Sequence, residues 1–251
     1  MHGMKTALIT GASGGVAAAL TRRLRAQGWR MVLVSRDVTR FDTEHDDVAV
    51  QADVSTPGGA EAAFALAAER IGNVPDAVVN CAGNTLIAPL GRVTAEAFRN
   101  CMAANVDTAF FTVQAYTKAL LAAKRSGDIV LFSSVVAGMG VSNHTAIATA
   151  KGAIEALVRS IAADFSHQGI RINAVAPGLM RSPMTEKMLL NERSQQNIAA
   201  QYPLGRYGDA ADGAAVAAWL LSPDARWITG EVIHLDGGFS AVRPLVRGVE
   251  S

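Results

Sequence analysis

Two side chains that can carry a proton lie close together in the stretch NHTAIATAKG, residues 143–152. They are the imidazole of His144 and the ammonium group of Lys151, seven residues apart. Seven steps of about 100° return almost to the same side of an α-helix, so a helix here would present both groups on one face. Ile147 lies between them on that face, and its hydrocarbon side chain cannot donate a proton. The stretch therefore predicts a proton-transfer site of unusual composition.

His144 is the residue that we expect to act as a general acid, because imidazole exchanges protons near neutral pH. A nearby lysine charge and the positive end of a helix would both favour its neutral form. Thr145 is a weaker candidate, since a hydroxyl group is a poor acid and this one points about 100° away from His144. In a simpler interpretation, His144 is a polar residue near a helix start, capped by Ser142 or Asn143. Both interpretations stay open at this level.

A glycine-rich turn follows the first apolar run of the chain, TALIT at 6–10. In TGASGGVA (10–17), Gly11 permits a tight turn and Gly15 lets the backbone approach a pyrophosphate. A helix that starts here offers free N–H groups and a positive dipole end to phosphates. Ala17 stands where a third glycine is usual, and it is still small enough for close helix–strand packing. The spacing predicts a dinucleotide site, with a plain turn as the alternative. The residues expected to bind are Gly11, Ser13, Gly14, Gly15 and Val16.

The end of the second apolar run, RMVLVS at 30–35, reports on the ribose of the cofactor. An acidic residue at this point would bind the 2′-hydroxyl of NAD. The chain has Arg36 instead, and a guanidinium group can pair with the 2′-phosphate of NADP. Asp37 comes one residue late, and we expect its carboxylate to point elsewhere. The pattern favours NADP over NAD, although a solvated arginine would give the same sequence.

Short β-branched runs alternate with longer alanine-rich segments along the chain. Near-continuous apolar strands separated by helices predict a parallel sheet with helices on both faces. Right-handed crossovers then favour a doubly wound α/β sheet of the Rossmann type, as a single domain over residues 1–251. The stretch 179–207 interrupts the alternation with charges and prolines, and we expect either a mobile lid or an ordinary surface excursion. Strands are expected at 6–10, 30–35, 47–53, 76–80, 128–134, 170–177 and 231–236, and helices at 16–28, 58–71, near 94–124 and around Lys151 to about Ser166.

The composition excludes several classes of protein. The chain has 251 residues, half of them apolar, which is enough for a sizeable core in one domain. The formal net charge of +1 gives no overall field that would draw the protein to nucleic acid or to a membrane surface. Cys81 and Cys101 are too few for a disulfide framework and fit no zinc motif, so we expect no metal and a reducing cytoplasm. No leader peptide is visible, and the apolar runs are too short to span a membrane.

Several motifs follow one another in a fixed order and spacing. They are TGASGGVA (10–17), ADV (52–54), NCAG (80–83), Asn105 in AANVDTAF, VLFSSVVAGMG (130–140), Lys151, RINAVAPGLMRSP (171–183) and GEVIHLDGG (230–238). With these motifs the chain resembles the short-chain dehydrogenase/reductase family over nearly its whole length, most of all the acyl-carrier-protein ketoreductase and glucose-dehydrogenase-like branch. The resemblance implies hydride transfer between a nicotinamide cofactor and a carbonyl or alcohol. The LDGG segment resembles a part that packs against a neighbouring subunit in the family's tetramers, which implies a homo-oligomer.

The resemblance also implies a role for each matching residue. Ser134 would form a hydrogen bond with the substrate oxygen, Lys151 would bind the nicotinamide ribose, and Asn105 would help to hold a water near the lysine. Asp53 would contact the adenine ring, with the backbone of Val54 close by. The other residues implied at the cofactor site are Asn80, Ala82, Gly83, Pro177, Gly178 and Ser182.

The family pattern has a tyrosine thirteen residues after the serine and four residues before the lysine. Counting from Ser134 and from Lys151 leads to Ile147 both times, and none of the chain's three tyrosines falls there. A general acid typically contributes roughly 10²–10⁴-fold to the rate, so its loss would cripple an ordinary enzyme. Ser134 can still donate a hydrogen bond, but it does not readily give up a proton.

Three functions stay open. The first is an NADP-dependent oxidoreductase with a rearranged proton donor, because Asn105, Ser134 and Lys151 are present beside the lost tyrosine. The second is a catalytically silent NADP-binding protein, acting as a sensor or as the partner subunit of an active homologue. The third is an enzyme whose substrate brings its own acid or needs none, such as an iminium ion or an activated alkene. Apolar residues around 84–93 and 139–144 favour a moderately hydrophobic small-molecule substrate, and ordinary core packing would explain them equally well.

Overall fold

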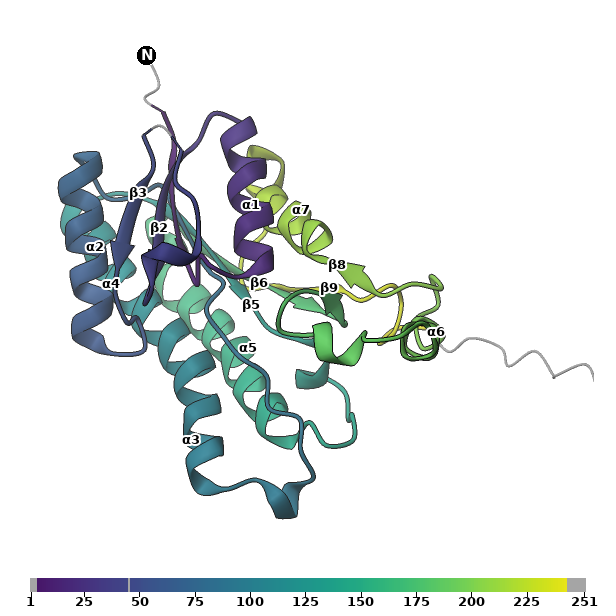
Figure 1. Ribbon diagram of the computed structural model, residues 1–251. Helices are drawn as coiled ribbons and strands as arrows, with labels where there is room; N and C mark the ends of the chain where they lie inside the picture. Colours follow the sequence, from purple (N-terminus) through teal and green to yellow (C-terminus); the bar gives the residue numbers. More distant parts are fainter. Residues whose placement is uncertain (1–3, 45, 243–251) are drawn as a thin grey trace, which may run out of the picture.

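The computed structural model describes residues 4–44 and 46–242, and seven of its strands form one parallel sheet (Figure 1). The strands are β1 Thr6–Thr10, β2 Arg30–Ser35, β3 Val48–Gln51, β4 Ala77–Asn80, β5 Gly127–Phe132, β6 Ile170–Pro177 and β9 Val232–Leu235. Their order is β3-β2-β1-β4-β5-β6-β9, so the direction of winding reverses between β1 and β4. The predicted doubly wound sheet is confirmed. The ends of the predicted domain, residues 1–3 and 243–251, lie outside the described residues, as does residue 45.

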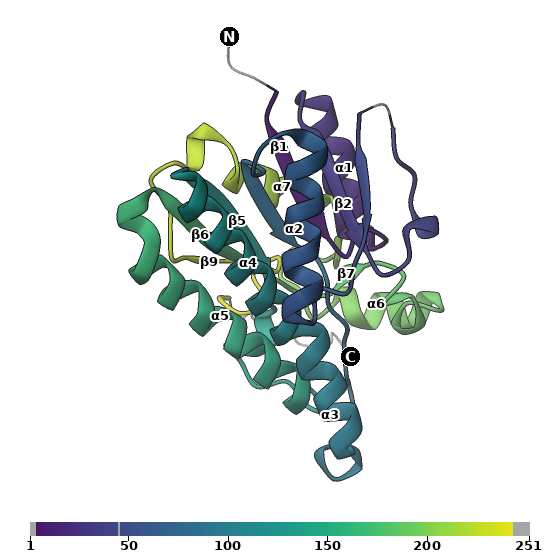
Figure 2. The same cartoon turned by 90° about the vertical axis from the view of Figure 1, so that its left-hand side faces the viewer.

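Helices cover both faces of the sheet (Figures 1 and 2). The helices are α1 Gly15–Ala26, α2 Pro57–Ile71, α3 Ala95–Met102, α4 Thr108–Ala123, α5 Thr145–Phe165, α6 Glu192–Ala199 and α7 Ala210–Leu220. Helices α2, α4 and α5 share a core with Leu8 and Val78, whereas α1 and α7 share one with Ile9 and Val79. Neighbouring residues of one strand thus point to opposite faces, as the pleat requires, and both faces are buried. Within the described ranges, no helix is long and apolar enough to cross a membrane.

The segment near 94–124, which we expect to be one helix, is divided. A π-helical turn at Ala103–Asp107 separates α3 from α4. The side chain of Asn105 explains this break, because its Nδ2 donates a hydrogen bond to the carbonyl O of Cys101 at 2.9 Å. That carbonyl is the acceptor that the backbone N–H of Asn105 would use in a regular α-helix. The prediction of an uninterrupted helix is therefore wrong, and the π-turn positions a buried polar residue.

The segment 179–207 contains regular structure of its own. Strand β7, Met180–Arg181, pairs with β8, Gly208–Asp209, in a second small sheet, and α6 lies between them. Leu189 and Tyr202 are buried and anchor the segment to the rest of the chain. The segment is a folded flap with attached ends, and its mobility stays a prediction.

Candidate active site

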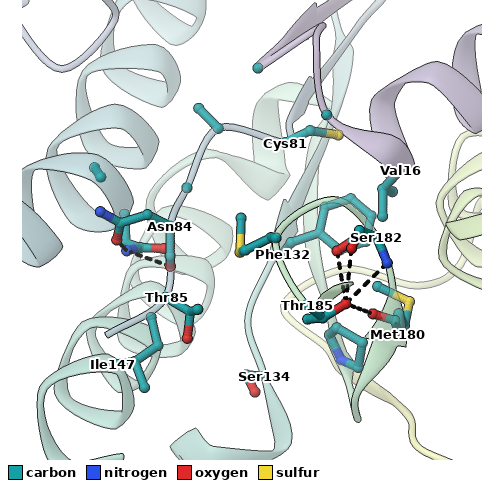
Figure 3. A pocket seen from close by; sticks show the side chains of 18 of the residues that line it. Val16, Cys81, Asn84, Thr85, Phe132, Ser134, Ile147, Met180, Ser182 and Thr185 are labelled. Carbon is teal, nitrogen blue, oxygen red and sulfur yellow. Dashed lines mark hydrogen bonds between the residues drawn. The ribbon is translucent and has the colours of Figure 1, made fainter. Parts of the chain in front are cut away.

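A cavity of about 970 Å³ lies at the carboxyl ends of the strands, where the winding direction reverses (Figure 3). Ligands of doubly wound sheets bind at this point. Asn80 is the one predicted site residue that does not line the cavity; it is buried, and its Oδ1 accepts a hydrogen bond from Oγ1 of Thr10, which ties β4 to β1. The predicted residues that do line it are Gly11, Ser13, Gly14, Gly15, Val16, Arg36, Asp53, Val54, Ala82, Gly83, Asn105, Ser134, His144, Lys151, Pro177, Gly178 and Ser182.

The glycine loop between β1 and α1 fits a pyrophosphate group. Gly11 has a φ of +63°, and a Cβ added to it would lie 2.6 Å from the backbone N of Ala82. Only glycine therefore lets this turn approach the loop after β4. Gly14 caps α1 with an extended backbone and no side-chain hydrogen bond, and the first turn holds no acidic residue. The free N–H groups at this helix end are left for an anionic ligand.

The end of β2 presents two cations to the cavity. Arg36 and Arg40 both line it with exposed side chains. Asp37 lines the cavity as well, and its carboxylate accepts hydrogen bonds from the backbone N of Thr39 at 3.0 Å and from its Oγ1 at 2.6 Å. These bonds from Thr39 hold the pKa of Asp37 below its usual range. The sequence analysis missed Arg40, since its place in a single 3₁₀ turn, Val38–Arg40, follows no periodic pattern.

The turn after β3 is fixed by a carboxylate. Oδ1 of Asp53 accepts hydrogen bonds from the backbone N of Ser55 at 3.0 Å and from its Oγ at 2.6 Å. These bonds hold the pKa of Asp53 below its usual range, so the side chain is a fixed anion at the cavity wall. Val54 next to it is buried, and its side chain anchors the turn in the core.

Lys151 and Asn105 converge at the centre of the cavity. The ammonium group of Lys151 donates a hydrogen bond to the carbonyl O of Phe132 at 2.8 Å, and burial lowers its pKa from 10.5 to about 8. Oδ1 of Asn105 is buried without a hydrogen-bond partner. A Cβ added to Gly83 would lie 2.8 Å from that oxygen and 3.7 Å from Nζ of Lys151. A buried acceptor and an ammonium group thus flank the same small space, which suits a polar guest.

The orientation of the Asn105 amide is set by its nitrogen. Nδ2 donates to the carbonyl O of Asn84 at 3.2 Å, to Oδ1 of Asn84 at 3.0 Å and to the carbonyl O of Cys101 at 2.9 Å. With the nitrogen bound on one side, the oxygen must face the other, toward Gly83. The π-turn therefore gives the cavity a fixed acceptor.

Ile147 occupies the position beside Lys151 where an acid is missing. Its side chain is 4% exposed, lines the cavity and packs in an apolar cluster with Val135 and Val136 (Figure 3). Of the three tyrosines, only Tyr202 lines the cavity, and its hydroxyl oxygen accepts a hydrogen bond from the backbone N of Leu179 at 2.6 Å. Ile147 thus contributes an apolar side chain to this part of the cavity.

His144 lies at the start of α5 and lines the cavity half-buried. It is the N-cap residue itself, with φ −104° and ψ 12°, and its side chain makes no capping bond. Nδ1 lies 2.7 Å from the carbonyl O of Ser142, which fits a donor N–H at Nδ1. In that tautomer Nε2 is the nitrogen left for a ligand. Helix α5 begins at Thr145, so His144 lies one residue before the regular helix that carries Lys151.

The two cysteines are poor nucleophiles. Burial raises the pKa of Cys81 to about 12, and burial also raises the pKa of Cys101. Both thiols are free, and both stay protonated near neutral pH. Among the residues that the structure describes, no group of three or more His, Cys, Asp or Glu side chains is placed to hold a metal ion.

Several residues that line the cavity were not predicted from the sequence. They come from the flap and from the segment after β9, and they gather only in three dimensions: Met184, Met188, Ile198, Tyr202 and Phe239. Their apolar character is unremarkable in a sequence that is half apolar. The flap also reaches the nucleotide loop, because a Cβ added to Gly15 would lie 3.4 Å from Cδ of Pro183.

Known proteins resemble this chain in sequence and in fold. A family model described as enoyl-(acyl carrier protein) reductase matches residues 11–240. The chain is 32% identical over 247 residues to the (3R)-3-hydroxyacyl-CoA dehydrogenase of Rattus norvegicus, over 92% of this chain and 95% of the relative. It is 31% identical over 239 residues to 3-oxoacyl-(acyl-carrier-protein) reductase FabG of Vibrio cholerae, over 93% and 96% of the two chains. The structure of a 4-hydroxyisoleucine dehydrogenase complexed with NADH matches with a TM-score of 0.88 at 25% identity, over 95% of this chain and 100% of the other.

Proposed function

Because the chain belongs to the short-chain dehydrogenase/reductase family of oxidoreductases, we propose that it transfers hydride between NADP and a carbonyl or alcohol substrate without a catalytic tyrosine. The observation that carries this proposal is the cavity itself. It combines an open glycine loop, two cations at its nucleotide end, and Lys151 beside the unpartnered oxygen of Asn105. The NADH complex of the 4-hydroxyisoleucine dehydrogenase supports a nicotinamide cofactor here. The two free thiols fit a cytoplasmic protein.

The cofactor would supply the hydride, and the residues of this chain would bind and orient it. The amides at the start of α1 would hold the pyrophosphate, as the uncapped helix end allows. Arg36 and Arg40 would pair with a 2′-phosphate, which favours NADP over NAD. Lys151 would bind the nicotinamide ribose, and Asn105 would accept a hydrogen bond from a water near it. Ser134 would donate a hydrogen bond to the substrate oxygen.

We assign the proton transfer to His144. It is the titratable side chain at the cavity end of α5. With Nδ1 donating to the carbonyl O of Ser142, Nε2 would accept the proton of an alcohol when the ring is neutral, and it would give that proton to a carbonyl oxygen when the ring is an imidazolium. Removing a general acid should lower kcat by roughly 10²–10⁴-fold and leave the Kd of NADPH unchanged. The test is the variant His144→Ala, with exposed His167→Ala as a matched control. An unchanged kcat in His144→Ala would remove this residue from the mechanism.

A second candidate function is cofactor binding without turnover, as a sensor or as the partner subunit of an active homologue. The buried hydrocarbon side chain of Ile147 next to Lys151 favours this function. The hydroxyl of Tyr202 is bound to the backbone of Leu179, and the thiol of Cys81 has a pKa of about 12, so neither group replaces the missing acid. Titration with NADPH by fluorescence, followed by a panel of carbonyl compounds, separates the two functions. Tight binding with no oxidation of NADPH across a broad panel supports the silent protein.

The variant Ile147→Tyr distinguishes a third candidate, an enzyme for an iminium ion or an activated alkene. Ketone reductase activity that appears only in this variant means that the scaffold is otherwise ready for the ordinary reaction. If the substrate needs no acid, Ile147 is a packing wall, and tyrosine at this position brings no gain.

A further inference from the structure

We propose that Phe239, Tyr202 and Ile147 form the surface that binds an uncharged, apolar part of the substrate, and that this end of the cavity discriminates against anionic substrates. The inference rests on the proposed oxidoreductase function and adds the chemical class of its substrate.

Most of the formal charge in the cavity lies near the glycine loop. Within the described ranges, the charged side chains that line it are Arg36, Asp37, Arg40, Asp53 and Lys151. The first four follow β2 and β3 and suit a nucleotide. Lys151 lies at the centre of the cavity, where its ammonium group is bound to the carbonyl O of Phe132 and faces Gly83.

The rest of the lining has no such charges. The cavity residues that come from 135–147, from the flap and from position 239 include no Asp, Glu, Lys or Arg. His144 is the one imidazole among them. A carboxylate or phosphate placed against Tyr202 and Phe239 would lose its water, and neither aromatic ring supplies a cation to replace it, which carries a large free-energy cost.

An aromatic pair forms the wall at this end. The ring centroids of Tyr202 and Phe239 are 5.1 Å apart, with an interplanar angle of 34°. The hydroxyl oxygen of Tyr202 is engaged by the backbone N of Leu179, so the polar tip of this residue has a partner in the protein. A Cβ added to Gly178 would lie 2.7 Å from Cε1 of Tyr202. Gly178 is therefore required for the ring to lie where it does.

Phe239 joins this wall to α5. Its side chain packs against the cluster that contains Ile147 and Val135, and its ring lies in tilted contact with Tyr202 from the flap. One apolar surface thus runs from the flap to the helix that carries Lys151. At Ile147 the surface continues as hydrocarbon where a hydroxyl would otherwise interrupt it. Apolar surface of this kind gains binding energy from apolar ligand groups and gives none to charged ones.

The test uses matched ligands that differ by one charge. The ligands are three keto acids, built on cyclohexanone, cyclopentanone and tetralone, each used as the free acid and as the methyl ester. Each ligand would be titrated by calorimetry at pH 8 into the full chain saturated with NADP⁺. We expect each ester to bind at least about tenfold more tightly than its acid. An acid that binds as tightly as its ester overturns the proposal, and so does binding of none of the esters.

Two variants tie the effect to the aromatic wall. Phe239→Ala should raise the Kd of the esters by about tenfold or more, because it removes the apolar contact, and Phe239→Leu should restore part of the affinity. Phe98→Ala, at a partly exposed phenylalanine outside the cavity, is the control. Equal ester affinity in Phe239→Ala and Phe98→Ala overturns the proposal. Binding of NADPH is measured in parallel. If the unaltered chain does not bind NADPH, this result contradicts the proposed oxidoreductase function instead.

Discussion

The ammonium group of Lys151 is buried, and it donates a hydrogen bond to the backbone carbonyl of Phe132. Burial lowers its pKa from 10.5 to about 8, so the folded protein binds this proton less tightly than the unfolded chain does. The free energy of unfolding therefore rises as the pH rises from about 8 to 10.5. Below pH 8, the folded protein bears the full free-energy cost of burying the charged lysine. That cost is about 3 kcal/mol, at 1.36 kcal/mol per pKa unit.

The variant Lys151→Met should accordingly stabilise the protein near pH 7. We expect the free energy of unfolding in urea to increase by up to about 3 kcal/mol at pH 7, with a smaller gain at pH 10, where the lysine is largely neutral. Lys118→Met is the control, because Lys118 forms an exposed ion pair with Glu61 at 3.0 Å, which contributes little. A gain that is the same at both pH values would show that packing, not charge burial, is the cause.

In the proposed NADP complex, Arg36 selects the cofactor. Replacing it by alanine would remove a charge-assisted hydrogen bond to the 2′-phosphate, so we expect the Kd of NADPH to rise by about tenfold or more while that of NADH stays constant. Fluorescence titration of both cofactors measures this ratio. Arg22→Ala on the exposed side of α1 serves as the control. Equal losses for both cofactors would mean that Arg36 contacts a part that they share.

At the scale of elements, the flap at 179–207 is held by its ends and exposed in its middle. Leu189 and Tyr202 are buried, whereas Leu190 is 74% exposed and no residue of α6 is buried. Because it covers one side of the cavity, we expect NADPH and substrate to slow amide hydrogen exchange in α6 and in the turn before it. The comparison is α2, which lies on the far side of the sheet from α1 and should keep its exchange rate. No change in the flap would make it an ordinary surface excursion.

The elements that the sequence predicts well are those with local causes. Strand β6 at Ile170–Pro177 has the predicted bounds, because a run of eight mostly apolar residues with β-branched members is short for a helix and favours a buried strand. Helix α2 begins within one residue of its predicted start, since Thr56 caps it and Pro57 opens it. The nucleotide loop is equally local, and the residues predicted from its glycines all line the cavity.

The features that the sequence does not predict depend on contacts across the fold. The π-turn follows from a side-chain bond of Asn105 to Cys101, which competes with the backbone ladder. The aromatic wall joins Tyr202 and Phe239, which come from different segments. Gly178 matches a cofactor motif, yet its missing side chain also makes room for Tyr202. Periodicity contains no information on such contacts.

At the scale of the whole molecule, large apolar side chains remain exposed on two helical surfaces. Phe110 and Leu121 on α4 are 45% and 41% exposed, and eleven steps of about 100° put them on the same side of that helix. Trp219 on α7 is 40% exposed, and Trp227 shortly after α7 is 97% exposed. Exposed patches of this type are more common in interfaces than on monomers. A second copy of the chain is the partner that we propose for these surfaces.

Light scattering after size-exclusion chromatography should therefore give a mass at least twice the 26.2 kDa of one chain. The double variant Phe110→Glu with Leu121→Glu should lower that mass, because it places like charges on a face that meets its own copy. Leu66→Glu on α2, where the leucine is also 41% exposed, is the control. All the predicted cofactor residues in the cavity come from one chain, so the dissociated variant should still bind NADPH. If the unaltered chain has the mass of one chain at micromolar concentration, the proposed assembly is contradicted. This result would not contradict the proposed cofactor site.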